Sequence, residues 1–556
     1  MNTTTPRPWK KYWPEGLDES AIVIPGDPLT FTLKRHAQAD PEKLAVVFYG
    51  REISRRELDD ASDRFAGWLL AQSVQPGDRV ALYLENSPQF VIAYMGALKA
   101  GAIVVCVNPM HKAFELQRDL VDCGARILVT ADHGSSIVEE VRRGTALEAV
   151  AAVDYRAYLP AEPTLPVPAS FLEPHRRATA AEDFQEIVTH TAPLARLVWR
   201  APDDTALLQY TSGTTGVPKG AEITHRNLVA NCELQKSYIE LQGDEVILGV
   251  LPWFHITGME CQMNLAVYLG APLVAIGRFE MDTVLLAIQR YRCTSTTLIA
   301  TLNAAIVNCG KAAGYDLSSL RACFSGGAPV PVALAERWEK STGFKLMEGY
   351  GLSETTAPTH INPPHRPKYG SVGLALPLTD VKLVSLEDGH TEVATGASGE
   401  VVVKGPMVMK GYWRKPKETA EVMQDGWFAT GDIGRFDDEG YLHIEERKKD
   451  LIKASGYSVF PAEVEAAMFR HPAVGEVGVV GVPDPYRGED VVAFVVLRPE
   501  ARGTLDGPAL VEWARAEMAV YKAPRTVVLV DALPRTASGK ILRRALREHP
   551  ALKPPA

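Results

Sequence analysis

The sequence predicts an α/β protein with two domains: a large N-terminal domain, residues 1–446, made of helix-covered sheets and a β-rich subdomain, and a small α+β C-terminal domain, residues 447–556. At 556 residues the chain exceeds what a single hydrophobic core usually supports. Strand and helix signals alternate in its first part, which is typical of sheets covered by helices. Beyond residue 446 the pattern changes to a compact mixture of strands and helices, of a length typical of a separate domain.

Between residues 44 and 125 the alternation is clearest. Ser54 and Glu57 have the spacing of a capping box, which predicts a helix after Ser54 with its apolar residues on one face. In order, the expected elements are a strand at 44–49, a helix carrying Leu58, Ala61, Phe65 and Leu69, a strand at 79–84, a helix at 88–99 and a strand at 103–107.

The rest of the chain divides by its turn signals. Residues 155–200, rich in proline, alanine and charge, are expected to be irregular, and residues 204–350 alternate between strand and helix again. Asp388-Gly389, Thr395-Gly396 and Asp438-Glu439-Gly440 predict β-hairpins between 370 and 445. In the C-terminal domain we expect strands at 475–481 and 491–497 and helices at 461–470 and 508–518.

The composition, with 46% apolar and 23% charged residues, is ordinary for a globular protein. No apolar run reaches the ~18 residues of a membrane span, and the N-terminus lacks the apolar centre of a signal peptide, so a cytoplasmic location is expected. The seven cysteines form no C-x-x-C pair, which favours reduced thiols over disulfides or zinc. Nothing in the sequence indicates a nucleic-acid partner.

The segment 210–220, YTSGTTGVPKG, has the composition of a loop that holds phosphate. Its glycines can turn backbone N–H groups towards an anion, its hydroxyls add donors and Lys219 adds a positive charge. The spacing is wrong for a Walker A loop, and no G-x-G-x-x-G follows a strand-like run. A flexible linker is the alternative, but residues 207–210 before the loop resemble a buried strand. The loop therefore points to ATP.

Further segments carry groups suited to a nucleotide. Glu354 is an oxygen ligand suited to Mg²⁺, and the nearby Tyr350 could stack on a base. Asp432 could accept hydrogen bonds from a ribose, with Arg447 following 15 residues later. Lys540 would supply a cation where a carboxylate meets the α-phosphate. Each of these residues alone could be an ordinary surface or core side chain, and it is their combination that favours ATP binding.

These segments, in this order, resemble the core motifs of the adenylate-forming superfamily of acyl-CoA synthetases, peptide-synthetase adenylation domains and luciferases, over about residues 30–548. Within it, the chain is most similar to bacterial long-chain fatty-acyl-CoA synthetases. The similarity lies in Val107-Asn-Pro109 followed by Glu115-Leu-Gln-Arg-Asp-Leu120, in Ser325-Gly-Gly-Ala-Pro329, in residues 348–354, in Lys410-Gly-Tyr-Trp413 and in Arg447-Lys-Lys-Asp450.

The resemblance implies an ATP-dependent fatty acid–CoA ligase that passes through an acyl adenylate and releases AMP and pyrophosphate. ATP, Mg²⁺ and coenzyme A are the implied co-substrates and metal, and a medium- to long-chain fatty acid is the favoured acid. By resemblance, the ATP phosphates are held by Thr211, Ser212, Gly213, Thr214, Thr215, Gly216 and Lys219, and Mg²⁺ is bound by Glu354 and Thr214. The adenine is lined by Gly326, Gly327, Ala328, Glu348, Gly349, Tyr350 and Gly351. Thr355 touches the α-phosphate, Asp432 and Arg447 hold the ribose, and His255 orients the acid.

The resemblance also implies that the C-terminal domain is mobile and turns about Lys449 between two half-reactions. Lys540 would act in adenylate formation. Lys453, Gly456 and Tyr457 would take its place when coenzyme A attacks.

The substrate is less sharply indicated. Where many relatives carry a proline-rich turn, this chain has Ile299–Ala305, although Gly349 and Gly351 would leave room for a chain where acetate-type relatives have a tryptophan. An aryl-CoA ligase, or an acyl-AMP ligase feeding a carrier protein, are the alternatives. Candidate acyl-pocket positions are Trp253, Gly258, Met259, Met263, Thr301 and Asn303.

Residues 9–13, WKKYW, could touch a membrane surface or a partner subunit, as in a homodimer, or form a packed or disordered arm.

Overall fold

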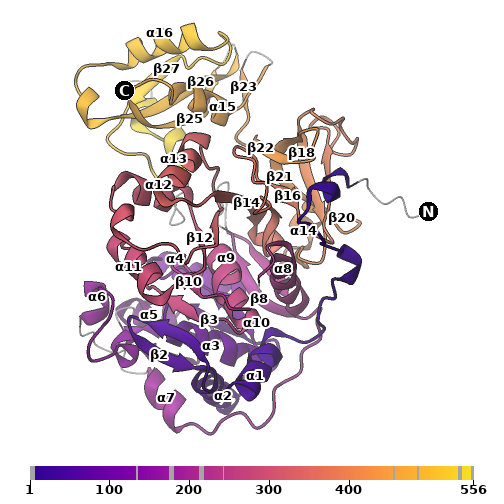
Figure 1. Cartoon of the computed structure of the whole chain (residues 1–556), viewed down its shortest axis with the longest axis vertical. Coiled ribbons are helices and arrows are strands. Elements are labelled where there is room, and N and C mark those ends of the chain that lie inside the picture. The colour runs from indigo at the N-terminus through magenta and orange to yellow at the C-terminus, as the bar shows by residue number, and fades with distance from the viewer. Residues whose placement is uncertain are drawn as a thin grey trace.

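The computed structural model describes residues 7–132, 135–173, 181–211, 218–241, 243–454, 457–484, 487–535 and 541–552. These residues form a large body that contains three sheets and a smaller C-terminal part, yellow in Figure 1, at one end of it. The mixed α/β architecture confirms the predicted fold class. None of the described helices has the length and apolarity needed to cross a bilayer.

The first sheet of the body has eight strands, and its central strands are parallel. Their order across the sheet is β19 (Gly411–Tyr412), β9 (Gly220–Thr224), β8 (Thr205–Tyr210), β4 (Ile103–Cys106), β3 (Arg79–Tyr83), β5 (Ile127–Ala131), β6 (Ala149–Val153) and β7 (Glu182–Asp183).

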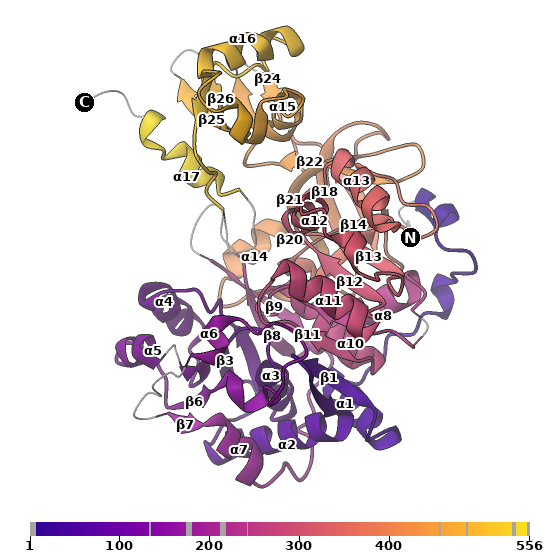
Figure 2. The ribbon, with the colours of Figure 1, turned by 60° about the vertical axis from the view of Figure 1, so that its left-hand side comes forward.

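The second sheet has nine strands and lies beside the first in the body (Figure 2). Their order is β16 (Leu374–Ala375), β15 (Ala357–Ile361), β14 (Leu346–Leu352), β13 (Ala322–Ser325), β12 (Ser295–Leu298), β10 (Ile247–Gly249), β11 (Leu273–Ala275), β1 (Leu44–Phe48) and β2 (Arg51–Ser54).

The predicted helices of the first 125 residues are confirmed. In α2 (Arg55–Ala71) the N–H of Glu57 donates to Ser54 Oγ at 3.1 Å, and the N–H of Ser54 donates to Glu57 Oε2 at 2.8 Å, which closes the capping box. Helix α3 (Pro88–Lys99) is buried along its whole length. At its end Lys99, with no exposed surface, places Nζ 2.5 Å from Asp59 and 2.6 Å from Asp63 of α2. A buried ion cluster therefore joins the two helices.

The expectation of an irregular segment at 155–200 is wrong in part. Its described residues contain α7 (Phe184–His190). Asp183 caps the start of this helix, and its carboxylate accepts two backbone N–H groups. Phe184 is buried against Phe65 of α2, with ring centroids 5.3 Å apart. An apolar face that the composition obscured thus anchors the segment to the body.

The β-rich subdomain follows the predicted hairpins. Its strands are β17 (Asp380–Val384), β18 (Gly399–Lys404), β20 (Met423–Gln424), β21 (Trp427–Phe436) and β22 (Leu442–Arg447). The N-terminal arm packs on this subdomain and on the second sheet. Trp9 stacks on Phe436 of β21 at 5.7 Å, and the indole N–H of Trp13 donates to the carbonyl of Ala375 of β16 at 2.9 Å. Both tryptophans are buried, which supports the packed-arm alternative.

The C-terminal part has its own sheet and its own apolar clusters, which contain residues from 452 onwards only. Its elements are β23 (Ile452–Ala454), β24 (Tyr457–Val459), α15 (Pro461–Met468), β25 (Val474–Asp484), β26 (Gly488–Leu497), α16 (Gly507–Glu517), β27 (Thr526–Leu529) and α17 (Arg543–Arg547). The separate cores support a division near residue 447, which stays a prediction.

Candidate active site

A cleft of about 2850 Å³ runs between the body and the C-terminal part. Its walls come from the second sheet, the β-rich subdomain, the β8–β9 connection and the start of α17. Sequence segments separated by hundreds of residues thus share one solvent-filled space, where a substrate can contact both parts of the chain.

The neck of the predicted phosphate loop opens into this cleft. The N–H of Thr211 donates to the carbonyl of Lys219 at 2.9 Å, so the two ends of the loop are pinned together beyond β8 and β9. Both residues line the cleft, and Lys219 Nζ lies 4.8 Å from the centre of the Tyr412 ring. The predicted phosphate-binding residues Ser212, Gly213, Thr214, Thr215 and Gly216 lie outside the described residues.

Glu354 stands on the cleft wall next to this neck. It belongs to the single turn η7 (Ser353–Thr355), and its Oε1 accepts the phenol O–H of Tyr412 at 2.8 Å. Burial, and then the neighbouring carboxylate, raise the pKa of Tyr412, so the phenol keeps its proton and remains a donor. One carboxylate held in this way suits Mg²⁺, which takes one or two protein carboxylates and completes its shell with phosphate oxygens and water. No cluster of three or more acidic, His or Cys ligands occurs among the described residues.

Tyr350, Asp432 and Arg447 form a second polar group on the wall of the cleft. Asp432 and Arg447 are register partners on β21 and β22, which explains their spacing, and Arg447 Nε lies 2.6 Å from Asp432 Oδ1. Tyr350 donates its phenol O–H to Asp432 Oδ2 at 2.6 Å. Burial, and then the charge of Asp432, raise the pKa of Tyr350 well above its usual range. The chemistry of this donor and acceptor set suits a ribose.

Most residues of the predicted adenine wall line the cleft, and their contact with a base stays a prediction. Gly327, Ala328, Glu348, Gly349, Tyr350 and Gly351 all line the cleft, whereas Gly326 is not among its described lining residues. Glu348 is buried and accepts the N–H of Val330 at 3.1 Å, and burial raises its pKa to about 8. A carboxyl group that is largely protonated at neutral pH can serve an uncharged base without an unpaired charge.

The structure gives a different reason for the glycines of this segment. A Cβ on Gly351 would lie 1.7 Å from the carbonyl oxygen of Ala357 on β15, and one on Gly349 would lie 3.3 Å from that of His360. Gly351 is therefore required by the close pairing of β14 and β15. The inference that these glycines leave room for an acyl chain is not supported, because their missing side chains would point at the adjacent strand.

Thr355 lies behind the wall. It is fully buried, its Oγ1 donates to the carbonyl of Ala357 at 2.9 Å and accepts the N–H of Leu352 at 2.8 Å, and it is not among the described lining residues. In this structure its hydroxyl shapes η7. The predicted contact with an α-phosphate stays a prediction.

His255 lines the cleft, and its predicted role in orienting the acid stays a prediction. It caps the short helix α9 (Ile256–Gly258), where its Nδ1 accepts the N–H of Thr257 at 3.3 Å. Beside it, α12 (Ala300–Asn308) presents Ala300, Thr301, Ala304 and Ala305 to the cleft. Of the six candidate acyl-pocket positions, Thr301 lines the cleft. The other five, Trp253, Gly258, Met259, Met263 and Asn303, are buried and are not among its lining residues.

From the C-terminal part, Arg535, Ile541, Arg543 and Arg544 line the cleft, and these residues flank Lys540 in sequence. Lys540 itself, and Gly456, lie outside the described residues, as does the side chain of Tyr457. Lys449 lines the cleft, whereas Lys453 is not among the described lining residues, and its backbone N–H donates to Glu489 Oε2 at 2.7 Å.

The sequence alone does not indicate the contacts of Tyr412, of the buried Glu446 or of the half-buried Arg543. Tyr412 lies in the Lys410-Gly-Tyr-Trp413 motif, but nothing in that motif indicates its hydrogen bond to Glu354. Glu446 and Arg543 have no local signal, since each is an ordinary charged residue until the fold brings the two together.

Family models match most of the chain. The model described as AMP-binding enzyme matches residues 33–413, and that described as AMP-binding enzyme C-terminal domain matches residues 463–540. The long-chain-fatty-acid–CoA ligase of Bacillus subtilis strain 168 is 37% identical over 553 residues, 98% of each chain. A feruloyl-CoA synthase from Amycolatopsis is 37% identical over 523 residues, 92% of this chain and 97% of that one.

Solved structures also match most of the chain. ATP-bound MatB from Rhodopseudomonas palustris superposes with a TM-score of 0.83 at 28% identity, and apo MatB with a TM-score of 0.72 at 28%; each match covers 94% of this chain and 99% of the other. The o-succinylbenzoate CoA synthetase MenE from Bacillus subtilis, in complex with ATP and magnesium, gives 0.79 at 29% identity and covers 94% of this chain and 100% of that one.

Proposed function

Because the chain belongs to the AMP-binding enzyme family, we propose that it is an ATP-dependent fatty acid–CoA ligase that works through an acyl adenylate. As a member of this family it is an acid–thiol ligase of the AMP-forming kind, with ATP, Mg²⁺ and coenzyme A as its co-substrates and metal. The observation that carries the proposal is the convergence of Glu354, the Tyr350–Asp432–Arg447 group and the neck of the phosphate loop on one cleft.

In the proposed mechanism the residues of the body bind and orient. Asp432 and Arg447 hold the ribose, Glu348 and residues 349–351 face the adenine, and Lys219 with residues 211–216 hold the phosphates. Mg²⁺, when bound, supplies positive charge to phosphate oxygens, and Glu354 is the carboxylate offered to it. Tyr412 fixes the Glu354 carboxylate by its hydrogen bond.

His255 orients the acid in the cleft, and Lys540 offsets the charge that builds up as the carboxylate meets the α-phosphate. Fixing both reactants in one cleft converts their encounter into an effectively unimolecular step. In the second half-reaction the thiol of coenzyme A displaces AMP to give the thioester, with Lys449, Lys453, Gly456 and Tyr457 on the C-terminal side.

The acid itself is proposed to be a medium- to long-chain fatty acid, on the similarity to the Bacillus subtilis ligase. An aryl acid is the second candidate, because the feruloyl-CoA synthase matches with the same identity. A panel of C6 to C18 and aromatic acids separates the two by kcat/KM.

The deciding experiment measures AMP release by the purified protein with ATP, Mg²⁺ and each acid, with and without coenzyme A. We expect acid-dependent pyrophosphate release without coenzyme A and AMP together with a thioester in its presence. Formation of ADP, or no acid-dependent product, would overturn the proposal. A thioester formed only on a carrier protein would instead indicate an acyl-AMP ligase.

The proposed location is the cytoplasm, which suits seven cysteines that are all free thiols. A homodimer and a peripheral contact with membranes are further proposals. Analytical ultracentrifugation and vesicle sedimentation test them directly.

A further inference from the structure

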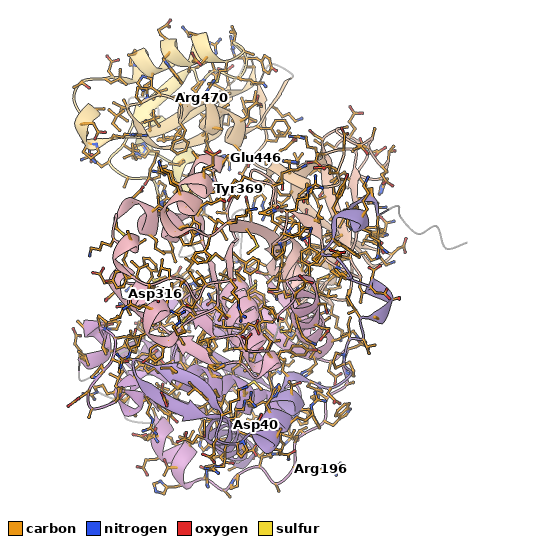
Figure 3. All side chains as sticks on the ribbon, in the orientation of Figure 1. Asp40, Arg196, Asp316, Tyr369, Glu446 and Arg470 are labelled. Atoms are coloured by element: carbon orange, nitrogen blue, oxygen red, sulfur yellow. The ribbon has the colours of Figure 1, made fainter. Side chains whose placement is uncertain are left out.

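Glu446, the residue before Arg447 on β22, connects the body to the C-terminal part. Its Oε2 accepts the N–H of Ala462, in the first turn of α15, at 2.9 Å and lies 3.6 Å from Nη2 of Arg543. Only 6% of its side chain is exposed. Figure 3 shows Glu446 below the C-terminal part, where the two meet. A carboxylate of the body is thus buried against two elements of the other part.

Arg543 is held from its own side as well. Its Nη2 lies 3.0 Å from Glu465 Oε1, and that carboxylate also accepts the N–H of Val479 at 2.8 Å. Arg543, Glu465 and Ala462 all belong to the C-terminal part, so these contacts would persist if that part moved as a unit. Movement of the C-terminal part relative to the body would instead break the contacts of Glu446 with Ala462 and Arg543.

The observed arrangement brings one particular side of the C-terminal part to the cleft. Arg535 and Ile541 are bridged in antiparallel fashion, and the N–H of Leu542 donates to the carbonyl of Pro534 at 2.8 Å. Arg535, Ile541 and Arg543 line the cleft. The Glu446 contact therefore holds the bridged pair Arg535 and Ile541 beside the cleft.

A similar arrangement is not the only one available to this fold. The ATP-bound and apo structures of the same relative match this chain with TM-scores of 0.83 and 0.72 at equal coverage. MatB is therefore found in two shapes, and its ATP-bound shape is more similar to this chain than its apo shape.

The chemistry of the contact suits a reversible clasp. Leaving one buried charge without its partner costs free energy, so the contact between Glu446 and Arg543 is favoured while water is excluded from it. When the two parts separate, water can solvate both charges, so the net free energy that opposes separation is small. An apolar interface of the same area would oppose separation of the two parts more strongly.

We propose that Glu446 is a positioning residue that holds Ala462 and Arg543 and so favours the arrangement in which Arg535, Ile541 and Arg543 line the cleft. This inference rests on the function proposed above, and it assigns Glu446 to the adenylate-forming half-reaction. Glu446 touches no reacting atom; it acts through the orientation of the C-terminal part.

Two assays separate the half-reactions: acid-dependent exchange of pyrophosphate into ATP, and thioester formation from a supplied acyl adenylate and coenzyme A. In Glu446→Ala we expect the exchange rate to fall at least 5-fold, while thioester formation stays within 2-fold of the unaltered protein. Glu446→Gln keeps an acceptor for the Ala462 N–H and should recover part of the loss.

The matched control is Glu445→Ala. Glu445 is the preceding carboxylate of β22, but its contacts with Arg435 and Ser398 stay within the body. We expect it to leave the ratio of the two rates unchanged. Hydrogen exchange at the peptide containing Ala462 should accelerate in Glu446→Ala and not in Glu445→Ala, which reports the clasp without activity.

An equal loss in both assays, no loss in either, or unchanged hydrogen exchange around Ala462 would each overturn the inference. Failure of the proposed function looks different: the unaltered protein would then show no acid-dependent exchange at all.

Discussion

Tyr350 and Asp432, on β14 and β21, are joined across the cleft wall by a hydrogen bond of 2.6 Å from the phenol to Oδ2. Because Arg447 occupies the other oxygen, the carboxylate is held in one orientation. A nucleotide that binds here would find its ribose acceptor already fixed.

Removing this phenol should therefore weaken ATP binding. A hydrogen bond to a charged group contributes about 1.5–3 kcal/mol, so Tyr350→Phe is expected to raise the KM for ATP about 10-fold with a smaller change in kcat. Tyr369→Phe is the control, since Tyr369 also donates to a carboxylate, Glu339, at 2.7 Å but does not line the described cleft. An unchanged KM in Tyr350→Phe would show that Asp432 needs no such support.

Glu354→Gln should impair metal use. The amide keeps an oxygen for Tyr412 but loses the negative charge, so we expect pyrophosphate exchange to fall about 100-fold, in the range for loss of one electrostatic stabiliser. The Mg²⁺ concentration for half-maximal rate should rise. Glu421→Gln removes an exposed carboxylate from the same cleft and serves as control. An identical Mg²⁺ dependence in the unaltered protein and Glu354→Gln would contradict the metal assignment.

Lys540→Ala and Lys453→Ala should have opposite effects. We expect Lys540→Ala to abolish most pyrophosphate exchange while thioester formation from a supplied acyl adenylate is spared. Lys453→Ala should spare exchange and slow thioester formation. Each variant is the control for the other, and equal losses in both assays would refute the division of roles.

The buried Glu260 should make stability depend on pH. Burial raises its pKa to about 8, although Asn264 donates to its Oε2 at 2.8 Å. The folded state therefore keeps a proton that the unfolded state loses above its pKa of 4.5. This contribution is complete below pH 4.5 and is lost as the pH rises towards 8, by about 1.4 kcal/mol per pH unit.

Glu260→Gln, which cannot ionise, is expected to flatten the corresponding decrease in the free energy of unfolding. Urea titrations at pH 5.5 and pH 8 measure it. Since other groups also titrate in this range, the comparison is the difference between the two proteins at each pH. A parallel pH dependence of both would show that Glu260 ionises freely in the folded state.

The ion cluster of Lys99 predicts a large loss of stability. Lys99→Met would leave Asp59 and Asp63 buried with less compensation, and breaking a buried pair costs about 3–5 kcal/mol. Lys34 also lies 3.0 Å from Asp63 but is one-third exposed, so Lys34→Met should cost about 1 kcal/mol or less. Thermal unfolding of both variants tests the contrast, and similar melting temperatures would argue against it.

Local signals in the sequence predicted much of the fold. The capping box of Ser54 and Glu57, helix α3 and the hairpin that pairs Asp432 with Arg447 all arise from residues close together in the chain. Their geometry follows from hydrogen-bond spacing and alternation. The segment around Phe184 was misjudged because its prolines and charges conceal a short amphipathic helix.

Contacts between distant segments could not be predicted in this way. Tyr412 meets Glu354 across 58 residues, and Glu446 meets Arg543 only because the C-terminal part docks beside β22. The positions of the acyl-pocket candidates could not be predicted for a related reason, since the burial of Trp253 and Met259 depends on how the sheets and helices pack. Periodicity reveals which residues are apolar, but not whether they enclose a cavity or fill it.

The close approach of Gly351 to Ala357 limits which residues this chain can carry at position 351. With the backbone as it stands, a Cβ there would collide with the carbonyl oxygen of Ala357, so β14 and β15 would have to move apart. The small side chains of α12 that line the cleft are therefore the more tolerant place to vary by directed evolution.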